Sequence, residues 1–213
     1  EYRLQTQESS QWHDTYRQQE AEIAGNPVRV ETERDDLLAI KARGVISDLR
    51  LSQGNSKQTR KLTASFDPEL PSESRKQLYA WVQNGWALNE KNLIADARAD
   101  ENKNGTLYVF VPARNRDEMQ QAITTIKATE ATLNIRGAPS SIEGKDARQA
   151  METRLAAAIG TRETLLDEIF QGVRVFISGG EEMDGNTLKD KLQIGANKAL
   201  ERIFKQFDIA DDA

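Results

Sequence analysis

The feature that most constrains the fold is a run of six apolar, aromatic or β-branched residues at 106–111, Thr-Leu-Tyr-Val-Phe-Val. A strand without polar alternation is buried on both faces, so this run predicts the central strand of a sheet. Residues 173–177, Val-Arg-Val-Phe-Ile, predict a second strand. We expect the second strand to lie beside the first, because the chain that leaves one returns as the other.

Two helices are predicted between these strands. Helical spacing of apolar residues begins near Asn115 and continues to about residue 134, and a longer helix is expected over residues 141–171, with Gly172 as its stop. At ~1.5 Å per residue the two helices measure roughly 30 and 45 Å. These lengths exceed what a small sheet needs as cover, so we expect an antiparallel pair that projects as an arm at about 115–172.

Helices are also predicted at both ends of the chain. Residues 2–24 are polar and rich in Gln, with sparse apolar anchors, and residues 25–27, Gly-Asn-Pro, break this helix. The sequence opens without Met, and so thin an apolar stripe predicts that the chain is a piece of a longer protein. At the other end, Thr187 with Asp190 forms a capping box before an amphipathic stripe.

Residues 28–105 predict two further separate helices and a β-hairpin. Thr32 is expected to cap a helix that stops at Gly44. Residues 46–51 and 61–66 alternate apolar with polar around a turn at Gly54-Asn55-Ser56, which predicts a β-hairpin. Asn89 is expected to cap a short helix.

Together these patterns predict an α+β fold. It comprises a small mixed β-sheet with a β-hairpin, a long antiparallel helical pair inserted between two apolar strands, and a C-terminal amphipathic helix. We expect an N-terminal helical segment over residues 1–44 and an α+β domain over 45–213, with the arm inside it.

Composition excludes several classes of site. The 213 residues carry a formal net charge of −5 and contain no Cys and one His, His13. Disulfides, thiol nucleophiles, Cys-ligated zinc and multi-histidine metal sites are therefore excluded. No stretch reaches the ~18 apolar residues of a membrane span, and a reducing cytoplasm fits the absence of Cys.

Candidate phosphate and cation sites fail on their chemistry. Residues 54–57, Gly-Asn-Ser-Lys, lack the spacing of a P-loop. Residues 178–180, Ser-Gly-Gly, precede Glu181, Glu182 and Asp184, which would repel a phosphate and lack a calcium-loop frame. We expect a solvated acidic loop there, and no catalytic, cofactor or metal residue in this chain.

A basic window at 41–61 leaves two interpretations open. It holds six Lys and Arg side chains against Asp48 alone. The hairpin could contact DNA phosphates through Arg50, Lys57, Arg60 and Lys61. Edge strands also carry such cations simply to prevent edge-to-edge pairing.

Two tryptophans, Trp81 and Trp86, bracket residues 82–85. Aromatic residues spaced in this way either fill a core or form a protein-binding hot spot. The sequence favours the core, and protein contact by Trp81 and Trp86 stays the alternative.

Six strings distributed along the chain resemble one family. They are Trp12-His-Asp-Thr-Tyr-Arg17, Gln53-Gly-Asn-Ser-Lys57, Trp81-Val-Gln-Asn-Gly-Trp86, Leu107-Tyr-Val-Phe-Val-Pro112, Glu168-Ile-Phe-Gln-Gly-Val-Arg-Val-Phe176 and Ala199-Leu-Glu-Arg-Ile-Phe204. With them the chain resembles a middle segment of the large P-loop ATPase of bacteriophage-exclusion (BREX) defence systems, the BrxC/PglY family.

The resemblance implies a large cytoplasmic AAA-like ATPase that acts beside a DNA methyltransferase in phage defence. ATP and Mg²⁺ would belong to the parent chain, because this segment lacks nucleotide-binding motifs. A non-catalytic scaffold or protein-interaction role is therefore expected, through self-association or binding to other BREX proteins such as the methyltransferase. A DNA-contacting module is the alternative, and a free-standing hydrolase lacks a nucleophile and base.

Overall fold

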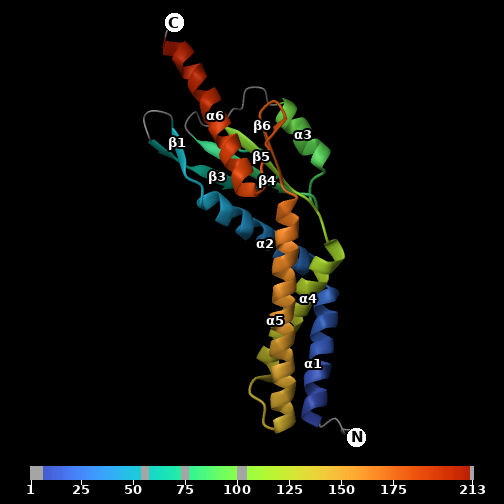
Figure 1. The fold of residues 1–213 in the computed structure, drawn as a ribbon. Coiled ribbons are helices and arrows are strands. Elements are labelled where there is room, and N and C mark those ends of the chain that lie inside the picture. The colour runs from blue at the N-terminus through green and yellow to red at the C-terminus, as the bar shows by residue number, and fades with distance from the viewer. Residues whose placement is uncertain (1–6, 54–57, 73–76, 100–104, 212–213) are drawn as a thin grey trace. The chain divides into compact units, whose positions relative to one another are not determined.

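A computed structural model describes residues 7–53, 58–72, 77–99 and 105–211. These residues form six helices, a five-stranded mixed sheet and a separate two-stranded ribbon, and this confirms the α+β class (Figure 1). The chain divides into two compact units. The helical unit comprises Glu1–Leu37 and Asn115–Asp167, and the sheet unit comprises Leu38–Arg114 and Glu168–Ala213. The domain boundary expected at residue 44 stays a prediction.

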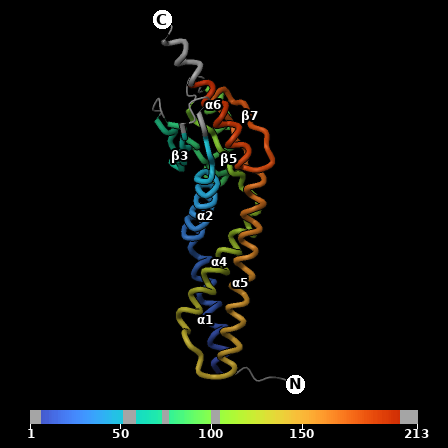
Figure 2. Tube along the Cα trace, turned by 60° about the vertical axis from the view of Figure 1, so that its left-hand side comes forward, coloured from blue at the N-terminus to red at the C-terminus, as the bar shows by residue number. Residues whose placement is uncertain are grey.

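The helical unit is built from α1 (Gln7–Ala24), the start of α2 (Pro27–Ser47), α4 (Arg116–Arg136) and most of α5 (Ile142–Gln171). Figure 2 shows α1, α4 and α5 running side by side. The sparse anchors expected in α1 are buried: Trp12, Tyr16 and Ile23. The antiparallel pair predicted between the two apolar strands is confirmed as α4 and α5.

The predicted bounds of α2 are wrong at both ends. The helix begins at Pro27, where the missing N–H costs nothing, and Asn26 caps it by accepting a 3.3 Å hydrogen bond from the Arg29 N–H through its side-chain oxygen. Thr32 lies inside the helix and donates to the Val28 carbonyl. The helix runs through Gly44 to Ser47 because Ala42 and Ile46, on either side of Gly44, belong to one buried stripe.

The start of α4 also differs from the expected cap. Asn115 occupies the capping position in the left-handed region, at φ 52°, without a side-chain hydrogen bond to the helix. Asn tolerates this conformation better than most residues. The helix ends at Gly137, whose N–H donates to the Leu133 carbonyl at 3.1 Å.

The sheet of the second unit has the order β3-β4-β5-β6-β7. These strands are Leu62–Ser65, Leu78–Asn84, Thr106–Val111, Arg174–Ile177 and Glu181–Glu182. Strands β3, β4 and β5 are parallel to one another. Strand β6 pairs antiparallel with β5, and β7 pairs antiparallel with β6. All six residues of β5 are buried, and β6 lies beside it, so both predictions for the apolar strands are confirmed.

Helices cover both faces of this sheet. On one face, α3 (Glu90–Ala99) packs Leu93 and Ala97 against Trp81 and Tyr108. On the other face, α6 (Leu188–Asp211) places Gly195 against Leu107. Adjacent residues of β5 therefore contact different helices, as the two-residue period of a strand requires.

The capping predictions for these two helices hold. The Asn89 side chain accepts from the Lys91 N–H at 2.9 Å. At the start of α6, Thr187 and Asp190 exchange backbone-to-side-chain hydrogen bonds of 3.1 Å in both directions. These are the reciprocal contacts of a capping box.

The predicted hairpin exists, but its strands are different residues. The ribbon pairs β1 (Leu51–Gln53) with β2 (Gln58–Arg60), and the predicted turn lies outside the described residues. Residues 46 and 47 belong to α2 instead. The predicted second strand occurs as β3, yet it pairs in parallel with β4, because buried β4 offers more apolar contact than a short ribbon.

Within the described ranges, no helix is long and apolar enough to cross a bilayer.

Candidate interaction surfaces

The residues predicted for DNA contact lie in and beside the ribbon. Arg50 and Lys61 are exposed just outside β1 and β2, and Arg60 is half-buried at the end of β2. Lys57 lies outside the described residues. In the antiparallel register Leu51 is opposite Arg60, so the next positions outward are Arg50 and Lys61. The fold thereby collects three cations at one end of the ribbon.

Two further cations of the basic window stack on aromatic rings. Lys41 lies 5.6 Å from the centre of the Phe170 ring, and Arg43 lies 4.7 Å from that of Phe66. These distances are within the range of cation–π attraction. Lys41 and Arg43 therefore also have a packing role.

Trp81 lies in the core of the sheet unit and is 2% exposed. Its ring meets Tyr108 edge to face at 6.0 Å, and its indole N–H donates to the Asp67 carbonyl at 2.9 Å. The Gln83 amide donates to the same carbonyl at 2.8 Å. Trp86 is half-buried in the turn after β4, where its backbone N–H donates to the side-chain oxygen of Asn84.

The acidic segment expected as a solvated loop forms strand β7 instead. Arg174 forms ion pairs with Glu182 and Glu90, and the Arg174 guanidinium holds the pKa of Glu182 below its usual range. Lys198 and Arg202 of α6 pair with Glu181 and lower the pKa of that carboxyl. These ion pairs link β7 to β6 through Glu182 and to α6 through Glu181, which sequence spacing alone does not reveal.

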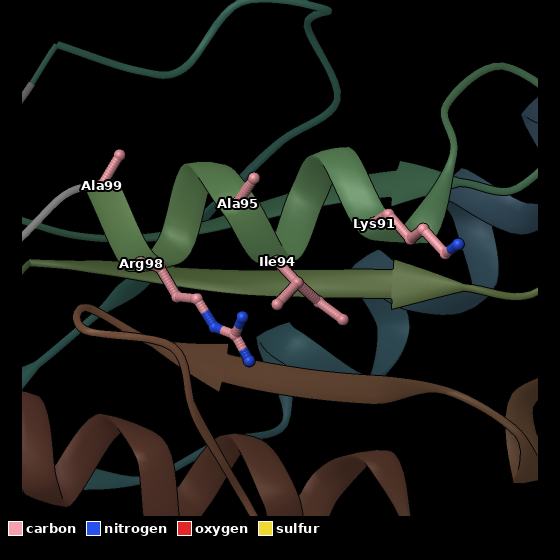
Figure 3. A pocket seen from close by; sticks show the side chains of 5 residues that line it. All are labelled: Lys91, Ile94, Ala95, Arg98 and Ala99. Carbon is pink, nitrogen blue, oxygen red and sulfur yellow. The ribbon is translucent and has the colours of Figure 1, made fainter.

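Other candidate groups do not converge. No set of three or more His, Asp and Glu side chains able to hold a metal ion is found in the part of the chain that the structure describes. His13 is exposed on α1. A shallow hollow on α3 is lined by Lys91, Ile94, Ala95, Arg98 and Ala99 (Figure 3). Because one helix supplies all five residues, the hollow does not surround a ligand.

The sequence interpretation missed the connection between α4 and α5, which we call the tip and define as residues 135–142. Glu8 of α1 accepts 2.9 Å hydrogen bonds from the backbone N–H groups of Ser140 and Ser141, and both hydroxyls also donate to it. The Ser141 hydroxyl and the Ser140 N–H thereby lower the pKa of Glu8. One carboxylate from a distant segment thus orders the turn.

Two arginines hold the other side of the tip. Arg136 donates to the Thr15 hydroxyl at 2.8 Å and to the Gln11 side chain at 3.1 Å. Arg148 of α5 donates to the Gly137 carbonyl at 2.7 Å. The tip is therefore attached to α1 and α5 as well as to the end of α4.

Large apolar side chains are exposed on this ordered tip. Ile135 is 60% exposed and Ile142 is 74% exposed, one at each end of the connection. Polar side chains form hydrogen bonds to the backbone of the turn, whereas the two isoleucines are exposed to solvent. A Ser-Ser pair just before a helix was the available sequence signal, but its partner Glu8 is more than 130 residues away.

No family model, curated protein or solved structure matches the chain.

Proposed function

We propose that this chain is a non-catalytic protein-interaction segment of a large bacterial BREX-type ATPase, and that its tip binds a second copy of the chain. The observation that carries the interaction role is the pair of exposed isoleucines, Ile135 and Ile142, on a turn ordered by Glu8. The BREX assignment is supported by the sequence resemblance. In that assignment ATP and Mg²⁺ belong to the parent chain in the bacterial cytoplasm.

An ordered apolar surface is suited to binding because its ordering cost is met before the partner arrives. Association normally costs about 0.5–1.5 kcal/mol for each rotamer-rich side chain that becomes immobilised, and the ordering of interface loops adds to this cost. Here the backbone of Ser140 and Ser141 is already hydrogen-bonded to Glu8, and Gly137 is held by Arg148. The tip therefore presents its isoleucines without further ordering of the turn.

The expected affinity of a single tip is low. Complete burial of an isoleucine contributes about 1.5–3 kcal/mol, so the exposed fractions of Ile135 and Ile142 contribute roughly 2–4 kcal/mol from each copy and about 4–8 kcal/mol in a contact between two copies, before the cost of association is subtracted. A dissociation constant of 1 mM corresponds to about 4 kcal/mol. Stable assembly thus requires several linked copies, as a multi-subunit ATPase provides.

Sedimentation velocity on the 213-residue chain, at concentrations up to about 1 mM, tests this proposal. We expect the mean sedimentation coefficient to rise with concentration. The double variant Ile135→Ser/Ile142→Ser removes both apolar groups and should sediment as a monomer throughout. The matched control is Val28→Ser/Ile40→Ser, whose side chains are 67% and 65% exposed elsewhere on the chain.

Two results contradict the proposed tip contact. One is a chain that remains monomeric over the whole concentration range. The other is equal loss of association in the tip variant and in the control, which would assign the effect to general surface hydrophobicity. If the chain instead binds only the BREX methyltransferase, a second copy is the wrong partner.

A further inference from the structure

We infer that the basic end of the β1–β2 ribbon, formed by Arg50 and Lys61, binds the phosphate backbone of duplex DNA. This site lies in the sheet unit and does not depend on the tip or on the proposed self-association. Its evidence is the register of the ribbon and the alternation of burial around the two cations; Arg60, opposite buried Leu51, lies on the other face.

The ribbon register brings together cations that are eleven residues apart in sequence. Antiparallel pairing sets Arg60 opposite Leu51, which places Arg50 and Lys61 at the same end of the ribbon. Phosphates on one DNA strand are separated by only a few ångströms, so a compact group of cations can neutralise adjacent phosphates. A scattered set of surface cations lacks this property.

Buried leucines direct the two exposed cations toward solvent. Leu49 and Leu51 are buried, whereas Arg50 between them is exposed. Likewise Leu62 is buried directly after exposed Lys61. The alternation of an extended chain therefore anchors the ribbon base on its apolar side and presents the charges on the other.

The position of these cations argues against simple edge protection. Protective Lys and Arg residues lie within an edge strand, where they block pairing with another strand. Arg50 and Lys61 instead lie immediately outside β1 and β2, beyond the residues that the two strands pair. Their placement is better explained by a ligand of opposite charge.

Geometry favours duplex DNA over other polyanions. The major groove of B-form DNA admits a two-stranded β-ribbon, whereas the major groove of A-form RNA is too narrow. Proteins that bind single strands rely on aromatic side chains for base stacking. Residues 50–61 contain no aromatic residue, so duplex DNA is the polyanion that the ribbon fits best.

The salt dependence follows from the number of cations. Two phosphate contacts predict a slope of about −1.8 for the logarithm of affinity against the logarithm of salt concentration. Affinity should then fall about 12-fold between 50 and 200 mM salt. The net charge of −5 on the chain makes low salt the condition of choice.

Fluorescence anisotropy of a labelled 20-base-pair duplex tests this inference on the 213-residue chain. In Arg50→Gln/Lys61→Gln, duplex binding should be lost and any residual slope should be close to zero, because neither phosphate contact remains. The matched control Arg29→Gln/Lys145→Gln removes the same charge from exposed positions of the helical unit and should keep the parental slope. Circular dichroism melting curves establish that each variant is folded.

Three results would overturn the inference: no binding to the duplex at 50 mM salt, an equal effect of the ribbon variant and the control, or binding of duplex RNA or a single-stranded oligonucleotide at least as tight. Displacement of the duplex by an equal charge of polyglutamate would assign the ribbon to acidic proteins instead. Loss of duplex binding in Arg50→Gln/Lys61→Gln, with unchanged sedimentation behaviour, would support it independently of the tip.

Discussion

Replacement of two helical glycines by alanine should change stability in opposite directions. Gly195 of α6 and Gly44 of α2 both belong to the sheet unit and lie inside helices. A Cβ at Gly195 would meet Leu107 Cδ2 at 3.1 Å and Met183 Cγ at 3.2 Å, whereas a Cβ at Gly44 meets nothing within 4 Å. The same Gly→Ala change therefore adds a methyl group to a tight helix–sheet contact at Gly195 and to open space at Gly44.

The expected magnitudes follow from two competing terms. Alanine is favoured over glycine inside a helix by about 1 kcal/mol, and this gain applies at both positions. Overpacking a closed contact costs about 1–3 kcal/mol, and only Gly195→Ala incurs it, because Leu107 and Met183 are fully buried. Gly44→Ala should stabilise the fold by about 1 kcal/mol, and Gly195→Ala should destabilise it by about 1 kcal/mol.

Urea unfolding monitored by tryptophan fluorescence measures both effects. With a denaturant slope of about 2 kcal/mol per molar, each variant should shift the unfolding midpoint by roughly 0.5 M, Gly44→Ala upward and Gly195→Ala downward. Trp81 and Trp86 report on the sheet unit that holds both sites. If Gly195→Ala raised the midpoint as much as Gly44→Ala, the close approach of α6 to the sheet would be refuted.

Two further predictions concern hydrogen bonds at helix starts. Thr187→Ala removes the capping hydroxyl that accepts from Asp190 N–H and should lower the free energy of unfolding by about 1 kcal/mol, measured in urea. The folded-state pKa of Glu8 lies below its ordinary value of about 4.3, so its contribution is complete above that value and lost as pH falls through the folded pKa. Glu8→Gln should therefore destabilise the chain at pH 7 and flatten its stability profile below about pH 4.3, measured by thermal melting across pH.

Each of these predictions has a contradicting result. An unchanged midpoint in Thr187→Ala would mean that solvent replaces the cap without loss. A Glu8→Gln profile parallel to that of the parent chain down to acidic pH would show that the carboxylate does not hold the tip, and the preorganisation argument would then fail.

The most reliable sequence predictions concern structure that neighbouring residues determine. The apolar run at 106–111 had to be buried on both faces, and the capping box of Thr187 and Asp190 is complete within four residues. The lengths of α4 and α5 followed from uninterrupted helical periodicity ended by glycine. Composition likewise excluded thiol and multi-histidine chemistry, because the residues themselves are missing.

Predictions failed where tertiary contacts favoured a conformation other than the one that local propensity indicated. Gly44 is a poor helix residue, yet the buried stripe that includes Ala42 and Ile46 continued the helix past it. Likewise, the sequence around Glu181 and Glu182 indicates a solvated loop. In the structure these residues pair with β6 as strand β7 and form ion pairs with Arg174 and Lys198. Local propensity was outweighed in both places by burial or charge pairing.

The sequence by itself determined the buried strands at 106–111 and 173–177, the helical pair between them and the capped start of α6. Only the tertiary structure decided that β3 pairs with β4, that Arg50 and Lys61 share one end of the ribbon, and that Glu8 orders the tip. The physical reason is the sequence separation of the interacting residues. Helical hydrogen bonds and caps join residues four or fewer positions apart, whereas strand partners and the tip contacts join segments whose meeting depends on the whole chain.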